Sequence, residues 1–273
     1  TRTSQGDILS TAFLSHGDTK HIMLLPSSPQ ECFTMAMDAF NLAEKFQTLV
    51  FVMSDLDLGM NNWMSEPFPY PEKPIERGKV LTKEDLDRLG KFGRYKDVDG
   101  DAIGYRTLPG TQHPAAAYFT RGSGHNAEAQ YSERPEDYEG NMERLRRKFE
   151  NARAFVPAPI VETMPNAEVG IIAFGSSHWA LTESRDQLRD EYTLATDYLR
   201  IRAFPFAPEI QDFVRAHKRV YVVEQNRDAQ MFSLLKLDLD GELVPKLRSV
   251  ARLDGLPLDA RSVTDDIAAM EGK

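Results

Sequence analysis

Short apolar runs alternate with helical patterns along much of the chain, and this alternation constrains the fold more than any other feature. Residues 21–26 and 48–54 are apolar runs with the length of buried strands. Between them, residues 29–43 repeat apolar side chains at steps of three and four, after a Ser-Pro-Gln-Glu capping box that begins at Ser28. Strands that are apolar throughout are typical of a parallel sheet covered on both faces.

The same alternation returns in the last 110 or so of the 273 residues. We predict strands over residues 169–174, 198–203, 219–224 and 248–252, and helices over residues 178–191, 208–217, 227–237 and 263–270. The fold class is therefore α/β, with two doubly wound parallel-sheet domains. The expected domains are residues 1–160 and residues 165–273, with a linker around residues 156–166.

Residues 60–160 form a long excursion from this pattern, rich in Pro, Gly, Asp, Glu and Tyr. The stretch EPFPYPEKPIERGK predicts an extended, proline-stiffened segment, and DVDGD at residues 97–101 predicts a tight turn. Apolar residues at helical spacing predict a helix over residues 135–153, and AAAYFT at residues 115–120 is a candidate strand.

Charge and cysteine content exclude several classes of protein. A net charge of −9 argues against nucleic acid as a partner, because phosphate backbones require a basic surface. No apolar stretch approaches the roughly 20 residues that span a bilayer, so no membrane association is expected. Cys32 is the only cysteine, which excludes an internal disulfide and a cluster ligated by this chain alone, and favours the reducing cytoplasm.

Polar stretches follow three of the predicted strands, where ligands of open parallel sheets collect. Asp55 and Asp57 are suited to chelating a metal, but their alternation with leucines favours a loop with buried and wet sides. Ser176 and Ser177 could seat a phosphate at a helix N-terminus or act as a plain N-cap, which we favour. His178 beside them has no evident partner and is expected in the first turn of that helix.

Two further stretches leave alternatives open. Glu224 could be a catalytic acid, but Gln225 and Asn226 beside it favour a polar network and helix cap. The loop RGSGHN, residues 121–126, offers a cation, flexible glycines and an imidazole, and a simple turn is an equal alternative. DVDGD does not fit a calcium loop, since its glycine is not sixth and its twelfth residue is Leu108.

Longer strings carry a family resemblance. TRTSQGD, LLPSSPQECFTMAMDAFNLAEKFQTLVFVMSDLDLGMNNW, AAYFTRGSGHN and RVYVVEQNRDAQ resemble the α subunit of bacterial 2-oxoacid:ferredoxin oxidoreductases of the 2-oxoglutarate type. The resemblance runs from Thr1 to about Val263. It implies that residues 1–160 are the later part of a thiamine-diphosphate pyrimidine-type domain and residues 165–273 a transketolase-C-like domain.

The resemblance also implies an activity and a set of partners. The assembled enzyme would oxidatively decarboxylate a 2-oxoacid, most simply 2-oxoglutarate, passing electrons to ferredoxin and the acyl group to coenzyme A. Thiamine diphosphate, Mg²⁺ and a [4Fe-4S] cluster would be held mainly by a β subunit, and none by this chain alone. Because TRTSQGD lies well inside the subunit in the family, we expect this chain to need a remaining N-terminal α segment and to be inactive alone.

Site residues follow from the same resemblance. The arginine of the TRTSQGD motif is implied to bind the substrate carboxylate, a role that falls on Arg2, with hydroxyls from Thr1 and Thr3 beside it. A guanidinium suits this role because it grips a planar carboxylate through two parallel hydrogen bonds. By analogy, Arg121, His125 and Asn126 would read the distal end of the substrate. The alternative function is a non-catalytic assembly module that retains the transketolase-like fold.

Overall fold

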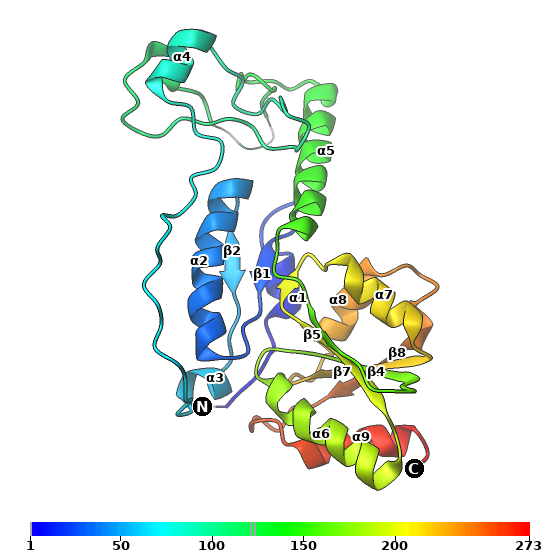
Figure 1. Cartoon of the computed structure of the whole chain (residues 1–273). Helices are drawn as coiled ribbons and strands as arrows, with labels where there is room; N and C mark the ends of the chain where they lie inside the picture. The colour runs from blue at the N-terminus through cyan, green and yellow to red at the C-terminus, as the bar shows by residue number, and fades with distance from the viewer. Residues whose placement is uncertain (1, 121, 123) are drawn as a thin grey trace.

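The computed structural model describes residues 2–120, 122 and 124–273, and these form two sheets flanked by helices (Figure 1). The smaller sheet has the strand order β2-β1-β6 and the larger one the order β3-β5-β4-β7-β8. The strands are β1 Ile22–Leu24, β2 Val50–Val52, β3 Ile160–Glu162, β4 Val169–Phe174, β5 Thr196–Ile201, β6 Ala203–Phe204, β7 Arg219–Glu224 and β8 Leu247–Ala251. The α-helices are α1 Ile8–Ala12, α2 Pro29–Phe46, α3 Leu56–Met60, α4 Lys83–Leu89, α5 Pro135–Asn151, α6 Ser177–Tyr192, α7 Pro208–Ala216, α8 Gln230–Asp238 and α9 Ala260–Met270.

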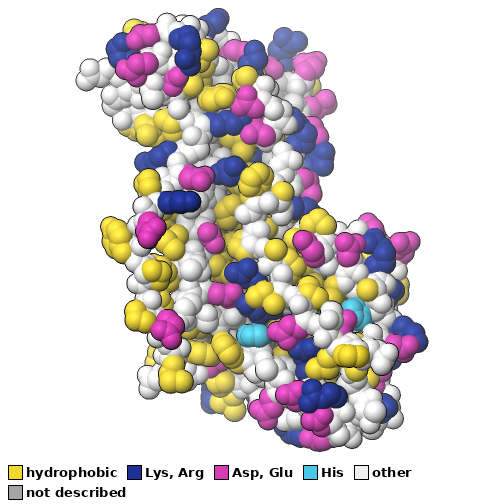
Figure 2. Space-filling view, viewed as in Figure 1, with side chains coloured by type: hydrophobic (Ala, Val, Ile, Leu, Met, Phe, Trp, Pro, Cys, Tyr) yellow, Lys and Arg dark blue, Asp and Glu magenta, His cyan; other side chains and the backbone are white. Residues whose placement is uncertain are grey.

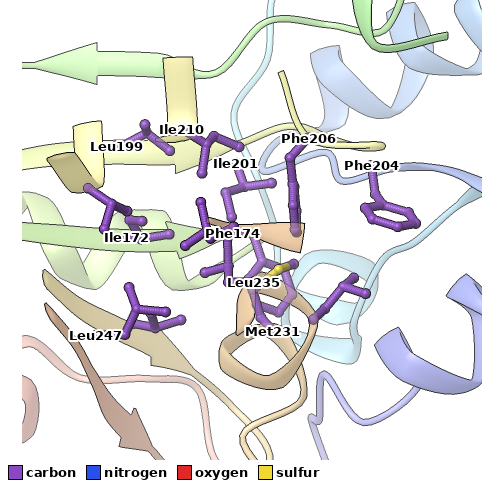
Figure 3. Close-up of a cluster of buried hydrophobic side chains, with 14 of the residues drawn as sticks. Ile172, Phe174, Leu199, Ile201, Phe204, Phe206, Ile210, Met231, Leu235 and Leu247 are labelled. Atoms are coloured by element: carbon purple, nitrogen blue, oxygen red, sulfur yellow. The ribbon is translucent and has the colours of Figure 1, made fainter. Parts of the chain in front are cut away.

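The larger sheet is covered on both faces, as a doubly wound fold requires. Strands β5, β4, β7 and β8 run parallel, so their carboxyl ends share one edge. Helices α6 and α9 lie on one face and α7 and α8 on the other (Figure 1). Leu181 and Val263 pack with Ile171 on the first face, whereas Met231 packs on the second with the apolar cluster drawn in Figure 3. The predicted α/β class with parallel sheets is confirmed.

The smaller sheet draws a strand from the later part of the chain. β1 and β2 run parallel, as expected for a strand-helix-strand unit around α2. β6 then pairs antiparallel with β1, through Met23 with Phe204 and Leu24 with Ala203. The largest apolar cluster likewise contains residues from both predicted domains. The two ranges, residues 1–160 and 165–273, therefore share one sheet and one core.

Helix α2 begins as the capping pattern predicts. The Ser28 hydroxyl accepts a hydrogen bond from the Glu31 backbone N–H at 3.2 Å, and Pro29 occupies the first turn. The Glu31 carboxylate reaches back to the N–H of Ser27 at 2.9 Å. The helix end is thus satisfied by its own sequence.

One prediction for local structure is wrong, and two sets of features were not predicted from the sequence. Residues 160–162 within the expected linker form β3, an edge strand antiparallel to β5. The expected strand at residues 115–120 is replaced by a single 3₁₀ turn, Pro114–Ala116, followed by irregular backbone. The short helices α1, α3 and α4 were not predicted, because five to seven residues give too few repeats for a periodic signal. Across the described residues, no helix combines the length and the apolar character needed to cross a bilayer.

Candidate functional site

The segment before α1 lies against the carboxyl ends of the strands. The Gln5 backbone N–H donates to the Gln225 carbonyl at 2.8 Å, just beyond β7, and the Thr3 N–H donates to the Gly255 carbonyl at 3.2 Å. Thr3 and Gln5 are buried, whereas Arg2 and Ser4 face outward. The alternation of buried and exposed residues is that of an extended strand-like segment.

The Gln5 side chain joins all three polar stretches predicted from the sequence. Its Oε1 accepts from the Gln225 N–H at 3.0 Å and from the Ser177 hydroxyl at 3.2 Å. Its Nε2 donates to the Phe174 carbonyl at 3.2 Å and to Asp55 at 3.3 Å. A buried amide with both donors and both acceptor positions in use is fully satisfied. The sequence reasoning missed Gln5, because only the folded sheet brings these strand ends to one point.

Asp55 and Asp57 serve the local structure in different ways. Asp55 accepts from the Leu58 N–H at 3.0 Å as the N-cap of α3, and from the Ser176 hydroxyl at 2.6 Å. The Asp57 N–H donates to the Thr3 hydroxyl at 3.3 Å. Burial raises the pKa of Asp57, and the nearby charge of Asp55 adds to this shift. No group of three or more metal-ligating side chains occurs in the described part of the chain, so these residues do not fit a Mg²⁺–diphosphate site by themselves.

Glu224 is a buried helix cap. Its carboxylate accepts from the N–H groups of Met231 at 2.8 Å and Phe232 at 3.0 Å, at the start of α8. The Asn226 amide donates to the same carboxylate at 2.6 Å and to the Gln5 carbonyl at 3.1 Å. Burial raises the pKa of Glu224, although these hydrogen bonds oppose the shift. The arrangement agrees with the predicted polar network and cap.

The serines at the start of α6 differ from the plain cap that was expected. Ser176 stands at the N-cap position but makes no side-chain cap hydrogen bond. Its hydroxyl instead donates to Asp55 and accepts from the Gln225 amide at 3.1 Å. His178, for which no partner was evident, lies in the first turn with Nδ1 3.2 Å from the Tyr198 hydroxyl. Burial lowers the pKa of His178, as does the charge of Arg200.

Arg2 presents its charge at the edge of this network. The side chain is exposed, and its aliphatic part lies against Gly255, where an added Cβ would be 2.8 Å from the Arg2 Cβ. Gly255 has φ +75°, so glycine suits this close approach in both space and backbone conformation. Within residues 2–120, 122 and 124–273, no carboxylate pairs with Arg2.

The remaining predicted site residues are not assembled around Arg2. Thr1 and Arg121 lie outside the described residues. His125 is stacked on Tyr95 with ring centroids 3.8 Å apart, and its carbonyl accepts from Asn141 of α5 at 2.7 Å. Asn126 closes a turn by accepting from the N–H of Gln130 at 2.9 Å. Figure 1 places α5, which contacts His125 through Asn141, away from α3 and the N-terminus, so one small substrate cannot touch Arg2 and His125 of the same chain.

The fold and its polar strand ends define a class of protein: a doubly wound α/β chain that gathers an N-terminal loop and three strand ends into one polar site. Residues 1–139 match the family described as pyruvate flavodoxin/ferredoxin oxidoreductase, thiamine diphosphate-binding. The chain belongs to this family.

Relatives agree with this assignment. The chain is 30% identical over 265 residues to 2-oxoacid:ferredoxin oxidoreductase 2, subunit alpha, of Aeropyrum pernix, covering 94% of this chain and 39% of the relative. It is 29% identical over 261 residues to 2-oxoglutarate synthase subunit KorA of Methanothermobacter marburgensis, covering 90% of this chain and 64% of that protein. The chain thus spans between about two fifths and two thirds of the length of these relatives.

A solved structure supports the fold. The 2-oxoglutarate:ferredoxin oxidoreductase from Magnetococcus marinus superposes with a TM-score of 0.83 at 24% identity. The match covers 98% of this chain and 45% of that one. Both sheets and the excursion therefore belong to an arrangement found in a solved protein.

Proposed function

We propose that this chain acts as part of the α subunit of a 2-oxoacid:ferredoxin oxidoreductase and orients the 2-oxoacid for thiamine-dependent oxidative decarboxylation. The proposal depends on the position of Arg2. Its side chain is exposed and lies against Gly255, beside the buried polar network at the strand ends. The names of the relatives, among them a 2-oxoglutarate synthase subunit, favour 2-oxoglutarate as the substrate.

Arg2 has the chemistry to hold the carboxylate of a 2-oxoacid. A guanidinium and a carboxylate form two parallel charge-assisted hydrogen bonds, which fix orientation as well as charge. The Thr3 hydroxyl accepts from the Asp57 N–H, so its own proton remains able to donate to a neighbouring oxygen. Gln5 holds the segment that carries Arg2 to the sheet, which keeps the base of the Arg2 side chain beside the strand ends.

Partners supply what the described residues do not provide. Thiamine diphosphate, Mg²⁺ and a [4Fe-4S] cluster would be held mainly by a β subunit, and ferredoxin and coenzyme A would accept the electrons and the acyl group. The Asp55 carboxylate caps α3 and the Asp57 carboxylate accepts from the Asn61 amide, so these two residues would not hold the Mg²⁺ of the cofactor. His125, which is hydrogen-bonded to Asn141 of α5, and Asn126 next to it would act on the substrate only from another copy of the chain.

Reconstitution tests the proposal. This chain is combined with the rest of an α subunit and a β subunit, and reduction of methyl viologen by 2-oxoglutarate and coenzyme A is measured. We expect Arg2→Ala to lower kcat/KM by about 30- to 1,000-fold, since one charged bidentate contact is worth roughly 2–4 kcal/mol. Arg134→Ala, an exposed arginine at the start of α5, is the matched control.

Two results would count against the proposal. Wild-type activity in the Arg2→Ala enzyme would remove the carboxylate role. An assembly that forms with all its subunits but reduces no viologen with any 2-oxoacid would favour the alternative, a non-catalytic assembly module with the same fold.

A further inference from the structure

Three cations line a cavity of about 630 Å³ between α5 and the loop at residues 15–19. We call Arg94, Arg144 and Lys148, with this cavity, the cationic pocket. Asp18 is the single acidic residue among the described residues that line it. The pocket shares no residue with the network around Gln5.

Arg94, Arg144 and Lys148 have no carboxylate partner in the described chain, in contrast to two neighbouring arginines of α5. Arg146 pairs with Glu143, and Arg147 pairs with Asp97 at 2.9 Å. Arg144 donates to the Ala102 carbonyl at 3.2 Å, and the Nε atoms of Arg94 and Arg144 are buried without a hydrogen-bond partner. Arg94 lies over the rings of Tyr95 and Tyr118, 5.1 and 5.6 Å from their centroids. In the described chain, none of the three cations pairs with a carboxylate, although α5 itself is rich in acids.

The charges of the cationic pocket repel one another. Burial, together with the charges of Arg144 and Arg94, lowers the pKa of Lys148 to about 8. Burial likewise lowers the pKa of Arg144, with Arg94 as the next cause. The three side chains are half-buried and carry like charges close enough to interact, so a bound counter-anion would relieve their mutual repulsion.

We propose that the cationic pocket binds a small molecule carrying phosphate groups with two or more negative charges. Three cations opposed by one carboxylate leave about two positive charges, which a monocarboxylate would not balance. The guanidinium of an arginine can donate two parallel hydrogen bonds to phosphate oxygens, and the ammonium group of a lysine adds a compact positive charge. The volume lies within the range of small-molecule sites and exceeds the size of a bare phosphate. This inference rests on Arg94, Arg144 and Lys148, none of which the proposed function uses.

Calorimetric titration of the whole chain tests the inference, with pyrophosphate and ADP as probes and adenosine as the uncharged control. We expect both phosphate compounds to bind at low salt and adenosine not to bind. Tighter binding of ADP than of pyrophosphate would identify a nucleotide as the ligand, and equal affinity would identify the diphosphate group as the part that is recognised.

Variants tie the binding to the cationic pocket. Lys148→Met and Arg144→Gln should each weaken pyrophosphate binding at least tenfold, because each removes one charged contact. Arg134→Gln, at the N-cap of the same helix and outside the cavity lining, should leave the affinity unchanged. Circular dichroism confirms that each variant is folded.

Three outcomes would overturn the inference. One is that neither phosphate compound binds the folded chain at millimolar concentration. Another is that binding persists unchanged in both pocket variants. The third is that a poly-glutamate peptide binds in a Lys148-dependent way while pyrophosphate and ADP do not, which would make the pocket a docking site for an acidic protein segment.

Discussion

At the scale of single residues, Glu31 links two parts of the chain through charge. Arg200 of β5 grips the Glu31 carboxylate with two hydrogen bonds of 2.6 and 2.9 Å, and Arg202 adds a third at 3.1 Å. Burial alone would raise the pKa of Glu31, but the hydrogen bonds from Arg200 and Ser27 outweigh it and lower the pKa to about 2. The folded state therefore favours the ionised form.

We expect Glu31→Gln to lower the free energy of unfolding by about 2–4 kcal/mol at pH 7, because Arg200 would stay buried without its counter-charge. The folded pKa of Glu31 lies below its ordinary value of 4.5, so the stabilisation is complete above pH 4.5 and is lost as the pH falls toward 2. Urea unfolding of both proteins across this range measures the difference. Glu191→Gln removes an exposed pair with Arg261 and should change stability little. A constant difference from pH 7 to pH 3 would contradict the prediction.

Lys148 presents the opposite case. Its pKa of about 8 in the folded chain lies below the ordinary value of 10.5, so the protonated form is destabilising at pH 7. Lys148→Met should raise the free energy of unfolding by about 1–3 kcal/mol at pH 7 in phosphate-free buffer. Above pH 8 the Lys148 ammonium of the wild-type folded state loses its proton, whereas the unfolded state keeps it up to about pH 10.5. The stability gained by Lys148→Met should therefore shrink between pH 8 and pH 10.5.

Urea unfolding at pH 7 and pH 10 checks the Lys148 prediction. Lys83→Met, on the exposed face of α4 and paired with Asp87, is the control. A Lys148→Met chain that is less stable than wild type at pH 7 would show that the lysine contributes a favourable contact.

At the scale of elements, strand β4 depends on a residue without a side chain. Gly170 lies in β4, where an added Cβ would be 2.6 Å from the Phe213 ring and 3.2 Å from the His217 ring. Both rings come from the end of α7 and its C-cap, so Gly170 sets how closely α7 approaches the sheet. The sequence predicted the strand and the helix but gave no sign of this contact.

We expect Gly170→Ala to lower the free energy of unfolding by about 1–3 kcal/mol, because neither ring can move without disturbing the packed face. Thermal unfolding followed by circular dichroism measures the change. Gly241→Ala is the matched control, since no atom lies within 4 Å of its added Cβ. Equal melting temperatures for the two variants would mean that α7 shifts freely on the sheet.

The predicted elements match best where the apolar pattern is long. The bounds of β4 and β7 coincide with the predicted strands, and those of α2, α6 and α7 lie within a few residues of the prediction. The missed strands β3 and β6 have three and two residues, too few for a periodic signal. Both are edge pairings made with strands that were themselves predicted.

At the scale of the whole molecule, the two predicted domains are joined by more than a linker. β6 completes the smaller sheet, and the main apolar cluster includes Ile8 and Met23 beside Ile172 and Leu199. Trp63 and Trp179, one from each part, lie with ring centroids 5.6 Å apart. Lysines, arginines and acids are intermixed over the face shown in Figure 2, so no single charge dominates there.

We expect the chain to unfold in one transition, because separating the two parts would expose a shared core and one edge of the smaller sheet. Urea titrations followed by tryptophan fluorescence and by far-ultraviolet circular dichroism should give the same midpoint. Trp63 and Trp179 report on the contact between the parts. A fluorescence transition that precedes the loss of secondary structure would show that the parts separate before they unfold.

The sequence alone determined the α/β class, the main strands and helices, and the family, because apolar periodicity and long matching strings are local properties of the chain. It also identified the three polar strand ends, since each follows an apolar run. Only the tertiary structure decided that Gln5 joins them, that β6 crosses into the smaller sheet, and that Arg2 and His125 lie apart. These features depend on contacts between residues up to about 220 positions apart, such as Gln5 with Gln225, and no local pattern encodes such a contact.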